Sequence, residues 1–110
     1  MNIEKYLRKE VRVVIDRPIG SKHPDFDLIY PLNYGYISGA SSEIDNEPID
    51  AYVLGPKEPL KKFTGKVIAI VKRVGDEEKL VVANENFTQE SIEQLIEFQE
   101  KYFKHDLIIL

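Results

Sequence analysis

Residues 30–54, with the sequence YPLNYGYISGASSEIDNEPIDAYVL, decide the fold of this chain. Three acids, Asp45, Glu47 and Asp50, fall within six residues, and an apolar, strand-like run follows directly. Pro48 pushes Glu47 towards extended backbone and marks the start or edge of a strand, because proline cannot donate to a central ladder. Asp45 and Glu47 then share one side of the chain, and Asp50 is able to turn towards them. Converging hard oxygen ligands suit Mg²⁺ or Mn²⁺ better than zinc, although an acidic turn without a ligand fits the same pattern.

The composition narrows the class of protein. A length of 110 residues predicts a single domain, residues 1–110, with one modest core. A net charge of -4 argues against a general nucleic-acid binder, which would carry a basic face. The absence of cysteine excludes disulfides, thiolate zinc sites and cysteine nucleophiles. The charged N-terminal segment lacks the apolar centre of a signal peptide and no apolar run reaches membrane-spanning length, so we expect a cytoplasmic protein without a membrane partner.

The distribution of β-branched residues predicts a mainly β protein. Five β-rich runs lie at residues 11–16, 30–37, 49–54, 65–74 and 79–83. The last two form a hairpin around an acidic turn. Residues 39–42 are expected as a loop, and residues 3–9 as a short helical turn or an irregular lead-in.

A C-terminal helix completes the predicted fold. Thr88 is a suitable N-cap, and an apolar stripe follows at helical spacing, formed by Ile92, Leu95, Ile96, Tyr102 and Phe103. The apolar tail, residues 107–110, is expected to pack against the rest of the chain. Five strands followed by one helix predict a small five-stranded closed barrel that is capped by the helix.

Two ordered motifs and one loop resemble those of soluble family I inorganic pyrophosphatases. The motifs are Tyr30-Pro-Leu-Asn-Tyr34-Gly-Tyr36-Ile and Asp45-Asn-Glu-Pro-Ile-Asp50, and the loop is the glycine-led acidic segment that ends at Lys79. In that family a YPxNYGxI segment precedes a DxDPxD signature on a barrel of OB-like topology. The resemblance covers residues 11–82 and, more weakly, the helix around Tyr102. It implies hydrolysis of inorganic pyrophosphate, or of another small phosphoanhydride, with Mg²⁺ or Mn²⁺ as the cofactor.

The resemblance implies roles for individual residues. Glu47 falls where the family has the aspartate that helps to activate the attacking water. The implied metal ligands are Asp45, Glu47, Asp50, Asp76 and Glu77. The implied catalytic or phosphate-contacting residues are Glu47, Tyr34, Lys79 and Tyr102. The implied supporting residues are Asp16, Lys22 and Lys104. Phosphoanhydride hydrolysis uses this chemistry, because bridged metals supply a hydroxide and clamp the oxygens while lysine and tyrosine donors complete the phosphate shell.

The chain also departs from the family's pattern. The family has a hairpin between its first strand and the tyrosine segment, and that hairpin carries a lysine and an arginine that grip phosphate. Here the connection is short, and its only basic candidates are Arg17, Lys22 and His23. The second acidic loop is shorter as well. Glu47 is one methylene longer than aspartate, and misplacement of a group by about an ångström can lower a rate ~100-fold.

Three hypotheses follow from the sequence. The leading one is a Mg²⁺-dependent inorganic pyrophosphatase that assembles as a homo-oligomer, as the apolar tail and the family resemblance suggest. The second is a related domain, with weak or no catalysis, that binds or cleaves another phosphorylated ligand such as a nucleotide. The third is an OB-like nucleic-acid module that uses Tyr34, Tyr36 and Tyr52 as stacking platforms, and the acidic charge balance opposes it. His23 and His105 are expected at the surface.

Overall fold

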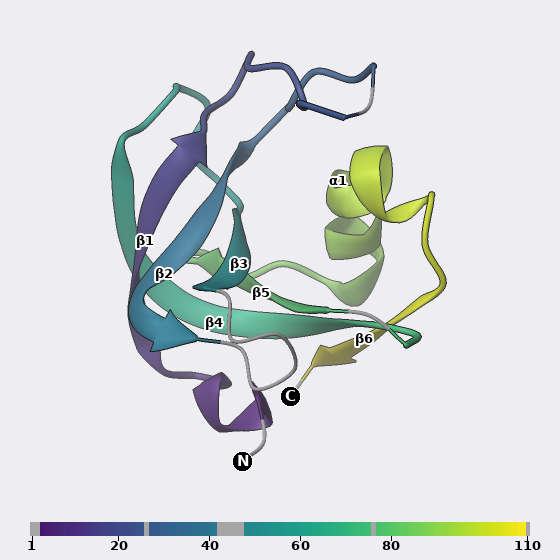
Figure 1. Ribbon diagram of the computed structural model, residues 1–110. Coiled ribbons are helices and arrows are strands. Elements are labelled where there is room, and N and C mark those ends of the chain that lie inside the picture. The colour runs from purple at the N-terminus through teal and green to yellow at the C-terminus, as the bar shows by residue number, and fades with distance from the viewer. Residues whose placement is uncertain (1–2, 26, 42–47, 76, 110) are drawn as a thin grey trace.

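The computed structural model describes residues 3–25, 27–41, 48–75 and 77–109. Its elements are η1 (Ile3–Tyr6), β1 (Glu10–Arg17), β2 (Asn33–Ser41), β3 (Pro48–Val53), β4 (Lys62–Arg73), β5 (Glu78–Ala83), α1 (Gln89–Glu100) and β6 (His105–Ile109). Figure 1 shows the strands curving around one another with α1 lying to one side of them. None of the helices in these ranges is long and apolar enough to cross a membrane.

Five strands close into the predicted barrel. They follow the order β1-β2-β3-β5-β4, and β4 returns to pair with β1. Among these pairs only β3 and β5 run parallel. The closed five-stranded barrel with a C-terminal helix is therefore confirmed. The apolar tail packs as expected, and it does so as a further strand, because β6 pairs with the second half of β4.

The barrel wall separates two hydrophobic clusters. The interior core is aliphatic and draws on all five barrel strands: Val13, Ile15, Ile37, Ile49, Ala51, Val53, Val67, Ile70, Leu80 and Val82. The helix-side core lies between the wall and α1, and it contains three tyrosines: Tyr30, Leu32, Tyr34, Tyr52, Leu54, Ala69, Val71, Val81, Ala83, Ile92 and Ile96. Because successive side chains of a strand point to opposite faces, neighbouring residues lie in different cores, and the same strands contribute to both.

The helix begins where the sequence predicts. Thr88 is its N-cap, and the Thr88 hydroxyl accepts a hydrogen bond from the Ser91 amide. Ile92 and Ile96 are buried, as expected. The rest of the predicted stripe is partly wrong, since Leu95 is 40% exposed and Tyr102 is 52% exposed. The helix ends at Glu100, so Tyr102 no longer follows the helical period.

Two predicted boundaries around β2 are wrong. The strand starts at Asn33 instead of residue 30, and it continues through residues 39–41, which were expected as a loop. Tyr30 lies before the strand and pairs its backbone with Gly20 and Ser21. Gly35 permits the tight contact between β1 and β2, because a Cβ atom there would lie 1.8 Å from the Val14 carbonyl oxygen.

Candidate active site

Parallel pairing of β3 with β5 brings together two residues that are far apart in the sequence. Asp50 and Lys79 are register partners across these strands. The Lys79 ammonium lies 3.7 Å from Asp50 Oδ2 and 3.7 Å from Glu77 Oε1. Lys79 is 3% exposed, whereas both carboxylates keep about a third of their surface. A largely buried cation is therefore held between two partly accessible acids.

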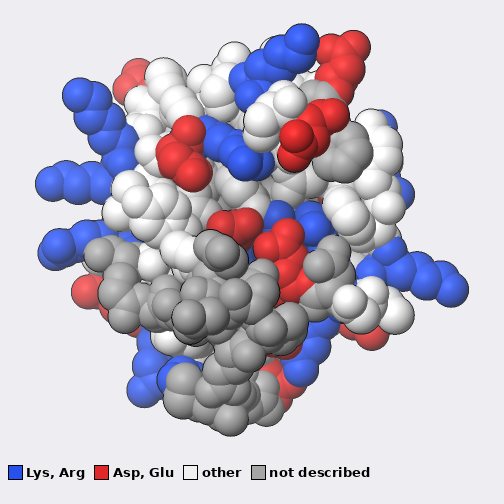
Figure 2. Space-filling view, viewed as in Figure 1, with Lys and Arg blue, Asp and Glu red and all other residues white. Residues whose placement is uncertain are grey.

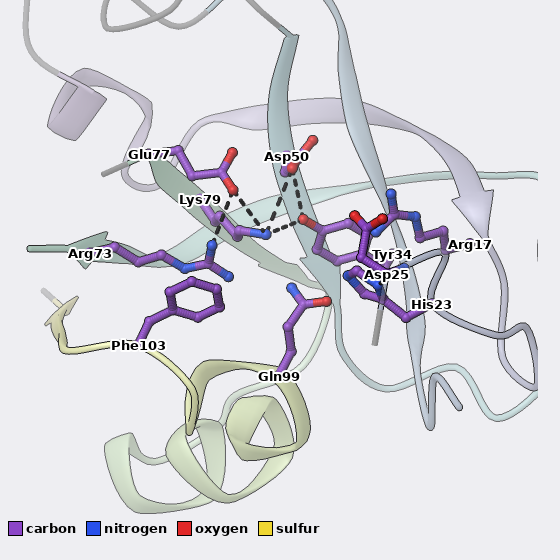
Figure 3. Close-up of a pocket in the computed structure, with 10 residues that line it drawn as sticks. All are labelled: Arg17, His23, Asp25, Tyr34, Asp50, Arg73, Glu77, Lys79, Gln99 and Phe103. Carbon is purple, nitrogen blue, oxygen red and sulfur yellow. Dashed lines mark hydrogen bonds and ion pairs between the residues drawn. The ribbon is translucent and has the colours of Figure 1, made fainter. Parts of the chain in front are cut away.

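Tyr34 joins this group from β2. Its hydroxyl donates to Asp50 Oδ2 at 2.7 Å and accepts a hydrogen bond from Lys79 Nζ. Burial, together with the charge of Asp50, raises the pKa of Tyr34 well above its usual value, so the phenol stays protonated. Burial, helped by the charge of Arg73, lowers the pKa of Lys79, while Asp50 and Glu77 oppose that change. Figure 3 shows the three side chains converging on one point.

Arg73 forms the second cationic element of the site. Its Nε and Nη2 donate to the two oxygens of Glu100 at 2.9 and 2.7 Å, and Nη1 donates to Glu77 at 3.1 Å. Its guanidinium carbon lies 3.7 Å from the centre of the Phe103 ring. Burial alone would raise the pKa of Glu100, but the bonds and charge of Arg73, together with the Tyr52 bond, lower it.

A β-bulge explains why Arg73 faces the helix. The register between β4 and β5 shifts between Val67 and Ala69, so Ile68 is an extra residue in β4. Val67 and Ile70 both enter the interior core, while Ala69 lies in the helix-side core. Without the bulge, regular alternation from Val67 would direct Arg73 into the barrel. The bulge is thus what makes this arginine available to the site.

A series of hydrogen bonds, buried except at Arg17, links the two arginines of the pocket. Arg17 Nη1 donates to the Tyr30 hydroxyl at 2.7 Å, and that hydroxyl donates to Gln99 Oε1 at 2.6 Å. Gln99 Nε2 donates to the Tyr52 hydroxyl at 2.8 Å. The Tyr52 hydroxyl then donates at 2.6 Å to Glu100, the carboxylate that holds Arg73. The last turn of α1 therefore fixes side chains on both sides of the site.

These residues surround a pocket of about 270 Å³. Its lining consists of Arg17, His23, Asp25, Tyr34, Asp50, Arg73, Glu77, Lys79, Gln99 and Phe103. Figure 2 shows acidic and basic atoms next to one another near the centre of this face, whereas most lysines and arginines extend outwards from its rim. Such a mixture suits a ligand that is anionic and accompanied by a cation.

His23 is buried in the pocket wall, so its expected surface position is wrong. Its ring stacks on Tyr30, with centroids 5.9 Å apart. Nδ1 accepts a hydrogen bond from the Asp25 amide at 2.9 Å, which requires a ring without a proton on that nitrogen. Burial and the charge of Arg17 lower the pKa of His23 and favour this neutral form. His105 is partly buried and bonds to Glu93 at 2.9 Å.

The structure brings some of the predicted site residues together and places others elsewhere. Tyr34, Asp50, Glu77 and Lys79 share the pocket. Four others do not line it: Asp16, Lys22, Tyr102 and Lys104. The remaining three lie outside the described residues: Asp45, Glu47 and Asp76.

The four residues outside the pocket have other surroundings. Asp16 is exposed on β1, although partial desolvation, and more weakly the charge of Asp50, raises its pKa against the effect of Arg17. Lys22 is exposed and lies 3.7 Å from Asp27. Tyr102 follows the helix at the surface, and Phe103 takes the place in the pocket that was expected for it. Lys104 is exposed, and its carbonyl accepts a bond from Val74.

The described residues supply only part of a metal site. Asp50 and Glu77 offer hard carboxylate oxygens to the same pocket, which fits Mg²⁺ or Mn²⁺ in ligand type. No group of three His, Cys, Asp or Glu side chains within the described ranges is arranged to hold a metal ion.

Tyr34 and Tyr52 do not support the nucleic-acid hypothesis. Their side chains are 2% and 0% exposed, and their rings pack edge-on with centroids 5.0 Å apart. Buried rings offer no face to unpaired bases, so the predicted stacking role of these two tyrosines is wrong.

Comparison with known proteins identifies the fold. A family model described as inorganic pyrophosphatase matches residues 5–106. The solved inorganic pyrophosphatase of Ehrlichia chaffeensis aligns with a TM-score of 0.72 at 14% identity, covering 94% of this chain and 87% of that chain. The enzyme of Coxiella burnetii aligns at 0.65 with 15% identity, covering 94% and 86%, and that of Thermus thermophilus at 0.60 with 17% identity, covering 91% and 80%. At these identities the structural likeness shows the OB-like fold alone. No curated protein matches the sequence significantly.

Proposed function

The chain belongs to the inorganic pyrophosphatase family, and we propose that its pocket hydrolyses inorganic pyrophosphate to two phosphates with Mg²⁺. The observation that carries this proposal is the group formed by Lys79, Asp50 and Tyr34 on adjacent strands. Hydrolysis of a phosphoanhydride needs donors for the phosphate oxygens and acids that hold a metal ion, and this group supplies both.

Family membership also brings a general dependence on metal, and we assign the metal to Mg²⁺, with Mn²⁺ as the alternative. Asp50 and Glu77 would hold it, and Asp45, Glu47 and Asp76 are the further ligands that we propose from the sequence. When bound, such a metal neutralises phosphate charge and activates the attacking water.

The chain's own donors bind and orient the substrate. Lys79 is the phosphate-contacting cation, and its contacts with Asp50 and Glu77 hold its ammonium group in the pocket. Tyr34 stays protonated, so its hydroxyl would be able to donate a hydrogen bond to a phosphoryl oxygen in place of its present bond to Asp50. Glu47 is our proposed partner for the attacking water. Asp16, Lys22 and Lys104 are the supporting residues that we propose from the sequence, although they do not line the pocket.

The proposal also covers the location, the oligomeric state and the partners of the protein. We place the protein in the cytoplasm, as a homo-oligomer without nucleic-acid or membrane partners. Its acidic balance and lack of cysteine support this setting. The half-buried β6 residues Leu107, Ile108 and Ile109 support self-association. Light scattering on the purified protein measures the oligomeric state, and fractionation of cells measures the location.

The test is phosphate release from pyrophosphate by the purified protein with MgCl₂, with MnCl₂, and with a chelator. We expect release with the metals, none with the chelator, and slower release from nucleoside triphosphates. Asp50→Asn should lower the rate about 100-fold or more, because it removes a carboxylate from the metal and from Tyr34. Asp106→Asn is the matched control, since Asp106 is exposed on β6. A folded protein that releases no phosphate with either metal contradicts the proposal.

A further inference from the structure

Arg17 is held in the pocket by a hydrogen bond to a neutral phenol, and the nearest acid that acts on its charge, Asp16 on the same strand, attracts it without forming an ion pair. Its Nη1 donates to the Tyr30 hydroxyl at 2.7 Å, and its guanidinium carbon lies 5.7 Å from the ring centres of Tyr30 and Tyr34. Within the described residues, no carboxylate oxygen lies within ion-pair distance of this guanidinium. A guanidinium keeps its charge at any ordinary pH, so a full positive charge faces the pocket beside neutral phenols.

The other two cations of the pocket are engaged differently. Arg73 makes ion pairs with Glu100 and Glu77, and Lys79 lies between Asp50 and Glu77. Their charges are largely balanced before any ligand arrives. Arg17 therefore has the strongest demand for an external anion among the pocket cations in the described residues.

Arg17 is also held in a fixed orientation. Tyr30 is fully buried, and its hydroxyl donates onwards to the buried Gln99 of α1, so the acceptor that holds Arg17 cannot move freely. One bond to Tyr30 leaves the other N–H groups of the fork for a second acceptor, and phosphate oxygens match that planar fork. In Figure 3, Arg17 and Arg73 lie on opposite sides of Lys79.

We propose that Arg17 directly binds a phosphoryl group of the substrate, opposite Arg73, and that Tyr30 and Gln99 are positioning residues for it. This inference rests on the proposed function for its choice of substrate. It gives the end of β1 a role, because Arg17 is the last residue of that strand and lines the pocket. The ligand class is a small di-anionic or poly-anionic phosphate that reaches from Arg17 across Lys79.

The test compares Arg17→Gln, Arg17→Lys and the control Arg12→Gln. Arg12 lies on the same strand, is exposed and lines a different cavity, so its loss removes the same charge away from the site. Two quantities are measured with MgCl₂ present: the Kd of inorganic phosphate by calorimetry, and the KM and kcat for pyrophosphate. Melting temperatures of all variants report whether each one is folded.

We expect Arg17→Gln to raise the phosphate Kd and the pyrophosphate KM by about 10- to 100-fold, the usual effect of losing a hydrogen bond between charged groups. Arg17→Lys should restore part of the affinity, because it keeps the charge but loses the fork. Arg12→Gln should stay within about twofold of the original protein. If Arg17→Gln does not fold, the difference between Arg17→Lys and Arg12→Gln in the same two constants decides the question.

The outcomes separate this inference from the proposed function. A folded Arg17→Gln protein with unchanged phosphate Kd and unchanged KM overturns the role of Arg17 while leaving pyrophosphate hydrolysis intact. A chain that binds phosphate through Arg17 but releases none from pyrophosphate supports the inference and contradicts the proposed function. Absence of phosphate binding to the unaltered protein overturns the inference.

Discussion

The two sides of the barrel wall differ in chemistry although the same strands build them. The interior core contains only aliphatic residues, from all five barrel strands. The helix-side core contains Tyr30, Tyr34 and Tyr52, and it borders the buried polar residues Gln99 and Glu100. The side-chain hydrogen bonds that connect Arg17 to Arg73 through Tyr30, Gln99, Tyr52 and Glu100 all lie on this second side.

In this small barrel, the residues that form the interior core and the residues that form the site alternate along the same strands. Asp50 and Lys79 belong to the site, while their immediate neighbours Ala51 and Leu80 belong to the interior core. The period of two along a strand makes that division possible. Substitutions of inner-side residues should therefore change stability alone, whereas substitutions of the polar residues that line the pocket on the outer side should mainly change activity.

The largest effect is expected for Leu80→Ala in the interior core. Leu80 is fully buried, so its truncation should lower the free energy of unfolding by about 3 kcal/mol. The fraction that remains folded should keep its kcat for pyrophosphate. Denaturant titration and steady-state kinetics on the same sample check both statements. Leu95→Ala, at an exposed position of α1, is the matched control with little change in stability.

Lys79→Met should lower activity strongly and stability only modestly, the reverse of Leu80→Ala. Loss of the buried ammonium should lower kcat/KM about 100-fold, equivalent to about 2.7 kcal/mol. The free energy of unfolding should fall by less than in Leu80→Ala, because methionine fills the space without the unfavourable desolvation of a charge. Lys66→Met, at an exposed position of β4, controls for the loss of a lysine. An equal fall in stability for Lys79→Met and Leu80→Ala would contradict the division between the two sides.

Tyr52→Phe tests the polar network that borders the helix-side core. The Tyr52 hydroxyl bonds to both Glu100 and Gln99, so its removal should lower the free energy of unfolding by about 1–2 kcal/mol. A smaller change in kcat/KM than for Lys79→Met should accompany it. Tyr6→Phe, at the half-buried Tyr6 of η1, provides the comparison by thermal melting. No change in stability would mean that the network adds nothing to the packing of α1.

The smallest effect is expected at the edge of the fold, where His105 of β6 bonds to Glu93 of α1. Burial alone would lower the pKa of His105, but the bonds to Glu93 and to the Phe103 carbonyl raise it. A raised pKa in the folded state means that the pair stabilises the fold fully below about pH 6.5, and that this contribution is lost as pH rises through the folded-state pKa. Glu93→Gln should lower the free energy of unfolding by less than about 1 kcal/mol, and the loss should be larger at low pH than at high pH. An effect independent of pH would show that His105 does not titrate with the fold.

Particular residues show which features the sequence could predict. The β-branched runs and the Thr88 cap predicted the barrel and the start of α1, because local patterning specifies them. The family resemblance implied that Tyr34, Asp50 and Lys79 belong to one site, and the structure brings the three side chains into contact. Their contact depends on the parallel register of β3 and β5, which no local pattern encodes.

The missed residues depended on tertiary structure. Arg73 lies near the end of the β-rich run at residues 65–74, and only the bulge at Ile68 directs it to the helix. Gln99 and Glu100 are polar residues in the last turn of a helix, where solvent exposure is the usual outcome. Glu100 is buried only because it meets Arg73, a partner that lies 27 positions away. The family resemblance implied a site role for Tyr102 and its spacing placed it on the apolar stripe of the helix, but the helix ends too early for the period to continue.

The central claim is that the helix-side pocket is where phosphate chemistry takes place. A crystal structure of the protein with MgCl₂ and the product phosphate tests it most directly. We predict phosphate in contact with Lys79 and Arg17, and a metal ion on Asp50. Phosphate bound elsewhere, with this pocket filled only by water, would contradict the account.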